Sequence, residues 1–138
     1  MGTWDSDSFG NDTAVDWTYG LNEVDDLRRI ETTLDAVLAY GPATPVSAEC
    51  AERAVAAAEV LARLKGHWGE ESAYSETADA WVRSHPIVPP PELIAKAVAA
   101  LRRITTTPSD LLELWDEEEE AGRWVDEVQE LEGRVTAA

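Results

Sequence analysis

The chain has 138 residues, and its 44% hydrophobic content with six tryptophans is sufficient for one packed domain rather than a disordered chain. Its net charge of −17 argues against nucleic acid and anionic membranes as partners, because both are bound through positive charge placed beside phosphates. The single cysteine, Cys50, excludes an intrachain disulfide, and with no signal peptide or membrane-spanning run visible we expect a cytoplasmic protein.

The first half of the chain is predicted to form three helices. Asn11 or Asp12 is expected to cap a short helix over residues 13–19, because a short polar side chain can accept the unpaired amides of a first turn. Apolar residues at helical spacing predict a second helix over residues 22–40 and a third over residues 47–66. The third helix is rich in alanine on one face, which indicates that another helix approaches it closely.

Three further helices are predicted in the second half. They cover residues 75–84, 91–104 and 108–136, and the second and third each begin at a proline, which is favoured in a first helical turn. Gly122 is expected to weaken the middle of the last, acidic helix or to mark a kink or a break in it. We therefore expect an all-α, compact single-domain bundle of five or six helices over residues 1–138.

The negative charge is concentrated at the two ends of the sequence. Residues 1–26 contain seven acids and no Lys or Arg, and residues 109–138 contain eleven acids against two arginines. Such a charge distribution attracts basic proteins and divalent cations, although it can also serve only to keep the protein soluble. Several acids stand four residues before an arginine, a spacing that favours an ion pair on one helix face. The predicted pairs are Glu49 with Arg53, Glu59 with Arg63, Glu119 with Arg123 and Glu130 with Arg134.

The densest acidic cluster is the run DEEEE at residues 116–120. On a helix these side chains point in several directions, so they form either a solvated face or a docking surface for a basic partner. The two flanking tryptophans are then either anchors for that partner or residues of the core. The candidate partner-binding residues are Trp115, Asp116, Glu117, Glu118, Glu119, Glu120 and Trp124.

The N-terminal acids suggest a different kind of site, for calcium or magnesium. When an EF-hand loop is started at Asp5, its positions 3, 6 and 12 fall on Asp7, Gly10 and Asp16. Position 5 falls on Phe9, which has no side-chain oxygen, and position 12 usually holds the longer glutamate. The candidate metal ligands are therefore Asp5, Asp7 and Asp16.

The same segment has an alternative, structural role. Its aromatic side chains can hold residues 1–20 against the helices, while a polar residue caps the helix that follows. We call this arrangement the latch. It comprises Trp4, Phe9, Asn11, Asp12 and Trp17.

No catalytic constellation is visible in the sequence. His67 and His85 lack metal-binding spacing, and no phosphate loop, nucleophile elbow or dinucleotide-binding turn occurs. Cys50 lies on an alanine-rich stripe and is expected to be buried and unreactive. We therefore expect a protein that is not an enzyme and uses no cofactor.

Motifs at both ends of the chain resemble one family. The chain starts MGTW and continues FGNDTAVDW at residues 9–17, and near its end it has SDLLELW at 109–115 and W-V-x-x-V-x-x-L at 124–131. These motifs resemble the bacterial family called domain of unknown function 4259. The resemblance implies no established activity and no catalytic residue. It also implies that Asp5 and Asp7 stand where the family commonly has glycine, which argues against the cation site.

These features predict a non-enzymatic, acidic protein that binds a basic protein. The leading example is an inhibitor or immunity protein against a basic toxin, whose active site is covered by residues 109–131 while the acids steer the encounter. The alternative is a small helical protein that binds calcium or magnesium through its N-terminal aspartates.

Overall fold

The structure, a computed structural model, describes residues 8–138. Within that range all regular secondary structure is helical, and a single isolated bridge joins Val46 to Ser109, so the predicted all-α fold is confirmed. The elements in chain order are α1 (Asp12–Tyr19), the 3₁₀ helix η1 (Gly20–Glu23), α2 (Arg28–Leu38), α3 (Ala48–Leu64), α4 (Glu76–Ser84), α5 (Pro91–Ile104), α6 (Asp110–Glu117) and α7 (Ala121–Thr136).

Seven α-helices are present in the described part of the chain, not five or six. The additional helix arises because the segment predicted as one helix over residues 108–136 is divided at residues 118–120 into α6 and α7. Gly122, the residue expected to weaken that helix, lies inside the first turn of α7 and does not interrupt it. The start also differs, because the side chain of Ser109 caps α6 and places the proline before the helix.

α2 begins at Arg28 and not near Asn22 as predicted. Residues 20–23 form η1 instead, and Val24 after them is extended, with φ −131° and ψ 151°. The carbonyl of Val24 accepts a hydrogen bond from Nε1 of Trp81 in α4 at 3.0 Å. A tertiary hydrogen bond therefore overrides the local helical pattern at this point.

α3 is the central helix, and every other α-helix of the described chain packs against it. From Cys50 to Arg63 all of its residues are buried except Arg53. Burial around the whole circumference is typical of a core helix, and the predicted alanine-rich face lets its neighbours approach closely.

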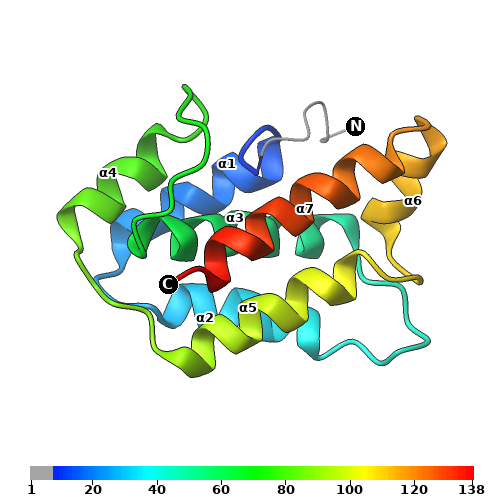
Figure 1. Ribbon diagram of the computed structural model, residues 1–138, viewed down its shortest axis with the longest axis horizontal. Helices are drawn as coiled ribbons and strands as arrows, with labels where there is room; N and C mark the ends of the chain where they lie inside the picture. Colours follow the sequence, from blue (N-terminus) through cyan, green and yellow to red (C-terminus); the bar gives the residue numbers. More distant parts are fainter. Residues whose placement is uncertain (1–7) are drawn as a thin grey trace.

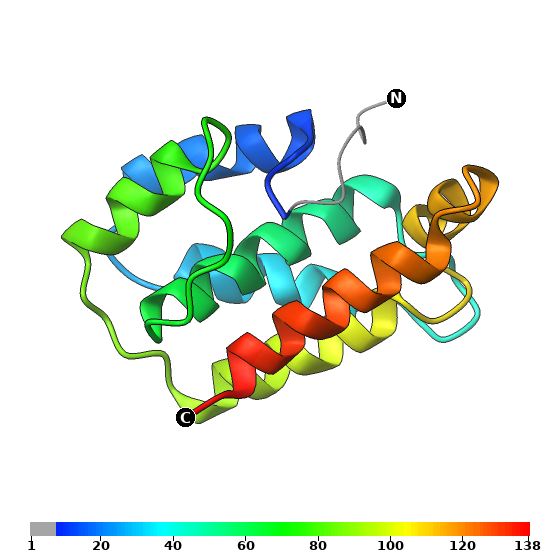
Figure 2. The same ribbon diagram turned by 45° about the horizontal axis from the view of Figure 1, so that its top comes forward.

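The surrounding helices lie on both sides of α3. Figure 1 shows α1 and α4 on one side of it and α2 and α5 on the other, and α5 and α7 run side by side in both ribbon views (Figures 1 and 2). In residues 8–138 no helix combines the length and the apolar character needed to cross a bilayer. This arrangement leaves the connection between α6 and α7 at one end of the molecule.

Candidate functional site

Residues 116–120, which we call the acidic turn, comprise the last two residues of α6 and the three residues that join it to α7. Glu119 adopts a left-handed backbone conformation, with φ 59°. The amides of Glu119 and Glu120 donate hydrogen bonds to the carbonyls of Asp116 and Trp115 at 3.0 and 2.9 Å. This pair of bonds is the Schellman arrangement, in which glycine usually occupies the left-handed position. The acidic run therefore forms a defined turn and not the continuous helix predicted from the sequence.

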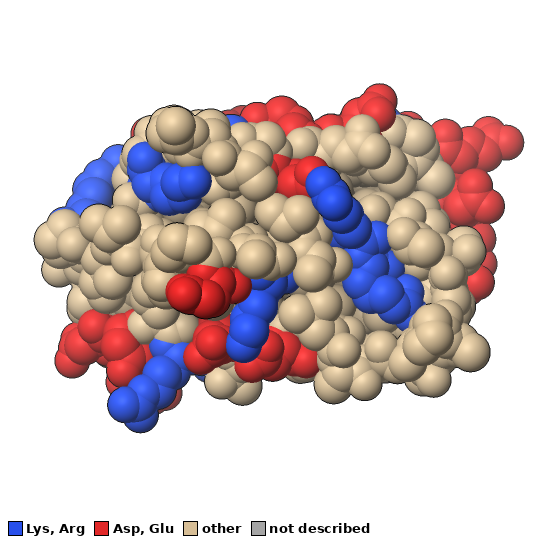
Figure 3. Space-filling view, turned by 60° about the horizontal axis from the view of Figure 1, so that its bottom comes forward, with Lys and Arg blue, Asp and Glu red and all other residues tan. Residues whose placement is uncertain are grey.

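The acidic turn is exposed and largely without counter-charge. Residues 116–119 are exposed, and within the described chain no ion pair neutralises any of them. Glu120 is half-buried and pairs with Nε of Arg123 at 2.8 Å, so the predicted pairing of Glu119 with Arg123 is wrong. Figure 3 shows acidic side chains gathered at the end of the molecule where α6 and α7 meet, whereas basic and acidic side chains are interleaved across the rest of that face.

Trp115 and Trp124 flank the acidic turn in sequence but lie in the core. Their exposed fractions are 7% and 3%. Of the two roles considered for them, the structure gives the core role, and neither indole offers a large surface to a partner. The acidic turn therefore presents its carboxylates without aromatic anchors.

The position of the acids works against the stability of α6. Asp116 and Glu117 stand in its last turn, where the unpaired carbonyls carry partial negative charge. A charge of the unfavourable sign at such a helix end costs about 0.3–1 kcal/mol. Asp116 and Glu117 therefore do not stabilise α6 through its dipole.

A second cluster of charges is buried between α3, α4 and α7. Nε of Arg63 donates to Oδ1 of Asp79 at 2.7 Å, and Nη1 of Arg63 bonds to Oε2 of Glu59. Arg134 donates to both oxygens of the Glu59 carboxylate, at 2.6 and 2.9 Å. The side chain of Arg63 is fully buried and that of Glu59 is 3% exposed. The predicted pairs Glu59–Arg63 and Glu130–Arg134 are confirmed. No sequence signal indicated that Asp79 or Arg134 would join Glu59 and Arg63.

The pKa shifts in this ion network follow from its geometry. Burial raises the pKa of the Glu59 carboxyl, but the hydrogen bond from Arg134 and the charges of Arg63 and Arg134 outweigh it, so the pKa lies below its usual value. Burial lowers the pKa of Arg134, and the bonds to Glu59 and Glu130 raise it to a net value above the usual one. Glu59 and Arg134 are therefore charged at neutral pH.

The first described latch residues connect this network to α1. The ring of Phe9 is fully buried and its centroid lies 5.2 Å from Cζ of Arg63. Asn11 is the residue that caps α1, because its Oδ1 accepts the Ala14 amide at 2.7 Å. Asp12 is exposed in the first turn of the helix.

Only one of the two tryptophans of the latch lies within the described residues. Trp17 is 4% exposed, and its Nε1 donates to Oγ1 of Thr33 at 2.8 Å, which joins α1 to α2. Trp4 lies outside the described residues. The structure therefore describes how the latch holds α1 but not how it begins.

The candidate cation site falls largely outside the described residues. Asp5 and Asp7 precede residue 8, and Asp16 is exposed on α1. Residues 8–138 contain no group of three or more His, Cys, Asp or Glu side chains placed to hold a metal ion. Binding of calcium or magnesium through the N-terminal aspartates stays a prediction, which titration calorimetry with each ion tests.

The histidines and the cysteine occupy structural positions. His67 lies beyond α3 with Nε2 3.0 Å from the carbonyl oxygen of Ala138, and His85 ends α4 with its ring stacked on Trp81. Cys50 is buried as predicted, and burial raises the pKa of its thiol although the nearby charge of Arg53 lowers it. A thiol with a raised pKa is a poor nucleophile at neutral pH.

Comparison with known families matches residues 2–127 to the model described as Domain of unknown function (DUF4259). The chain belongs to this family. The match includes the N-terminal motif and the SDLLELW segment, so it confirms the resemblance seen in the sequence. No activity accompanies the DUF4259 description, and no catalytic residue is carried over to this chain. No curated protein and no solved structure matches the chain.

Proposed function

We propose that the chain is a non-enzymatic protein that uses the acidic turn to bind a basic surface of another protein. The observation that carries the proposal is the placement of residues 116–119, which are four exposed carboxylates without ion pairs at one end of the molecule. The helices on both sides anchor the turn, since Trp115 and Trp124 are buried in the core. Concentrated charge of this kind raises the association rate with a basic partner by about ten- to a thousandfold at low salt.

The partner class that we favour is a toxin with a basic active site. Occlusion of that site by the acidic turn makes the chain an inhibitor or immunity protein that acts in the cytoplasm. Because no exposed aromatic anchor accompanies the acidic turn, charge pairs supply most of the specificity. We therefore expect the affinity to fall steeply as salt is raised, since exposed charges are screened beyond about 10 Å at 0.1 M.

A pair of charge-matched variants tests the proposal. The turn variant carries Asp116→Asn, Glu117→Gln, Glu118→Gln and Glu119→Gln. The dispersed variant removes the same charge from four exposed acids on other surfaces, each without an ion pair in the described chain. Its substitutions are Glu49→Gln, Glu76→Gln, Glu92→Gln and Asp126→Asn.

The immobilised wild-type chain is used to capture partners from native lysate at low salt, and the purified partner is then titrated against both variants. We expect the turn variant to bind at least tenfold more weakly and the dispersed variant to stay within about twofold of the wild type. The reason is that removing one charged partner of an interfacial hydrogen bond costs about 1 kcal/mol or more. Equal binding by the turn variant and the wild type, or the absence of any basic partner, would contradict the proposal.

A further inference from the structure

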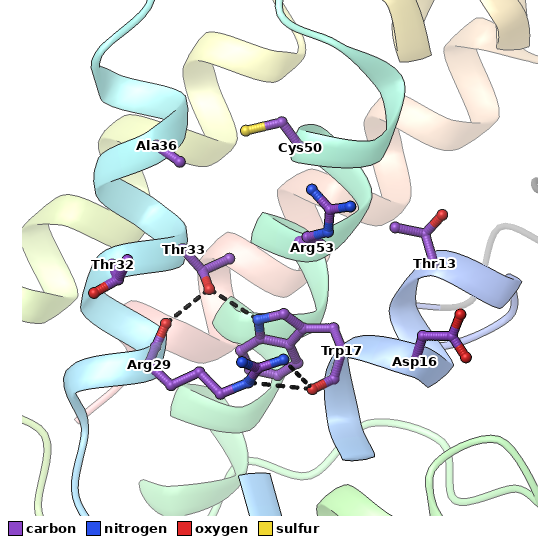
Figure 4. A pocket seen from close by; sticks show the side chains of 9 residues that line it. All are labelled: Thr13, Asp16, Trp17, Arg29, Thr32, Thr33, Ala36, Cys50 and Arg53. Carbon is purple, nitrogen blue, oxygen red and sulfur yellow. Dashed lines mark hydrogen bonds between the residues drawn. The ribbon is translucent and has the colours of Figure 1, made fainter. Parts of the chain in front are cut away.

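A hollow of about 440 Å³ lies between α1, α2 and α3, away from the acidic turn. Two arginines, Arg29 from α2 and Arg53 from α3, line it together with the hydroxyl-bearing Thr13 and Thr32 (Figure 4). We call it the arginine pocket. Its volume falls within the range of about 300–1,000 Å³ that is usual for small-molecule sites.

Arg29 is held in place by contacts with α1. Its Nε and Nη2 donate to the carbonyl oxygen of Trp17 at 3.3 and 2.8 Å, and its guanidinium carbon lies 5.2 Å from the centroid of the Trp17 ring. Gly20 leaves room for this arrangement, because a Cβ there would lie 2.2 Å from Cζ of Arg29. The guanidinium is thus fixed before any ligand arrives, and its Nη1 makes no hydrogen bond in the described chain.

Arg53 is the one exposed residue on the buried stretch of α3 from Cys50 to Arg63. Figure 4 shows its side chain between those of Cys50 and Thr13, at the opening of the pocket. No ion pair joins Arg53 to any residue from 8 to 138, so the pairing predicted with Glu49, one turn earlier on the same helix, is wrong. Within the described residues its guanidinium is therefore available to a ligand.

Neither arginine of the pocket has a carboxylate partner in the described chain, although the sequence has 28 acidic and only 11 basic residues. Burial lowers the pKa of Arg29, Glu23 raises it, and the charge of Arg53 lowers it again, so the two cations are close enough to repel each other. Asp16, the acid that lines the pocket, extends from α1 on the side turned away from Arg29 (Figure 4). Two positive charges that line one hollow and form no ion pair in the described chain fit a dianionic ligand.

We propose that the arginine pocket binds the phosphate group of a small phosphorylated molecule, with Arg53 and the free Nη1 of Arg29 as the charged donors. A phosphate monoester has three terminal oxygens and close to two negative charges, which matches two guanidiniums better than a carboxylate does. The net charge of −17 repels anions from the protein as a whole, so saturable binding of phosphate requires a local site of this kind.

The test is a titration of the full chain with phenyl phosphate, inorganic phosphate and benzoate, followed by calorimetry and by the backbone amide signals in NMR spectra. We expect saturable one-to-one binding of phenyl phosphate, with shifts confined to the residues around Thr13, Thr32 and Arg53. Arg53→Ala should weaken binding at least tenfold, and Ala36→Phe, which fills the hollow from α2, should block it.

The matched control is Arg28→Ala, which removes the same charge from a side chain that is 89% exposed and does not line the pocket. It should bind phenyl phosphate within twofold of the wild type, as should the turn variant, so this result is independent of the proposed protein partner. Unchanged binding by Arg53→Ala, shifts on another face, or no saturable binding would overturn the inference. Benzoate binding as tightly as phenyl phosphate would also overturn it, because the pocket would then recognise a carboxylate.

Discussion

At the scale of single residues, Arg63 is a fully buried charge that depends on several hydrogen-bond acceptors. Its guanidinium is fully buried and donates to Asp79, Glu59 and the carbonyl oxygen of Glu70. A charge removed from water is tolerated only when it is paired and hydrogen-bonded, so each of these acceptors is needed. The network therefore fixes the positions of α3, α4 and the segment after α3 relative to one another.

Glu59 and Glu130 both bind Arg134 but differ in burial. Substituting each in turn therefore separates the effect of burial on stability from the effect of charge. Glu59 is 3% exposed and Glu130 is 61% exposed, and each bonds to Arg134. Glu59→Gln should lower the free energy of unfolding by about 3 kcal/mol, because it leaves the buried guanidinium of Arg63 and the half-buried one of Arg134 without their shared counter-ion. Glu130→Gln should lower it by less than about 1 kcal/mol, because the pair is exposed to water. Urea unfolding at pH 7 measures both, and equal decreases would contradict the difference in burial.

The pH dependence of the same variant has a defined sign. The pKa of Glu59 is lowered in the folded state, so its ionisation contributes stability above the unfolded value of about 4.3, and this contribution is lost as the pH falls through the folded value. The difference in unfolding free energy between wild type and Glu59→Gln should therefore be constant from pH 7 to about 5 and shrink below about pH 4.3. A difference that stays constant down to pH 3 would show that the carboxylate charge contributes nothing.

The sequence indicates only part of this network, for a physical reason. Glu59 and Arg63 lie four residues apart on one helix, so their pairing follows from helix geometry alone. Asp79 is 16 positions from Arg63 and Arg134 is 75 positions from Glu59, and both come from other helices. Their contacts depend on how the helices pack, and an isolated sequence contains no local signal for that packing.

At the scale of secondary-structure elements, the division of α6 from α7 has a conformational cost. Glu119 holds φ at 59°, where a side chain is disfavoured by about 1–2 kcal/mol relative to glycine. The sequence predicts one helix here because the apolar spacing continues across the break and neither glycine nor proline stands at residues 118–120. The packing of Trp115 and Trp124 on the core therefore decides the break against local preference.

Glycine substitutions at neighbouring positions test that cost. Glu119→Gly should raise the free energy of unfolding by about 0.5–1 kcal/mol, since relief of the left-handed strain exceeds the entropy that glycine adds to the unfolded chain. Glu118→Gly should lower it by about 0.5–1 kcal/mol, because that residue has an ordinary φ of −89°. Each variant loses one negative charge, so thermal unfolding of the pair isolates the backbone effect. Effects of the same sign would contradict the turn geometry.

The outer elements are easier to predict than the breaks between them. The caps at Asn11 and Ser47 follow from short polar side chains before apolar runs, and both accept first-turn amides in the structure. The late start of α2 has no local signal, because Val24 is extended to meet Trp81 from a helix far along the chain. The arginine pocket has none for the same reason, since its arginines stand on two helices and show no motif spacing.

At the scale of the whole molecule, acidic residues at different places have different effects on the stability of the fold. In the dispersed variant, Glu49, Glu76 and Glu92 each stand in the first turn of a helix, where a negative charge is favourable. The acidic turn instead places Asp116 and Glu117 in the last turn of α6, where a negative charge is unfavourable, and it sets four carboxylates beside one another, although Glu118 and Glu119 also precede the first turn of α7. The same number of acids therefore acts on stability in opposite directions at the two places.

This contrast gives the last prediction. At 10 mM salt the turn variant should be more stable than the wild type by about 1 kcal/mol, because four neighbouring charges that repel one another are removed and two of them stand in the last turn of α6. The dispersed variant should be less stable than the wild type by about 1 kcal/mol, because favourable charges are removed from helix N-termini. Thermal unfolding across 10–500 mM salt measures both, and both differences should shrink as screening increases. If the turn variant were less stable than the wild type, the acids of residues 116–119 would serve folding, and their retention would no longer favour a partner. If the turn variant is more stable than the wild type and no longer binds the partner, the acidic turn lowers the stability of the fold and is needed for binding.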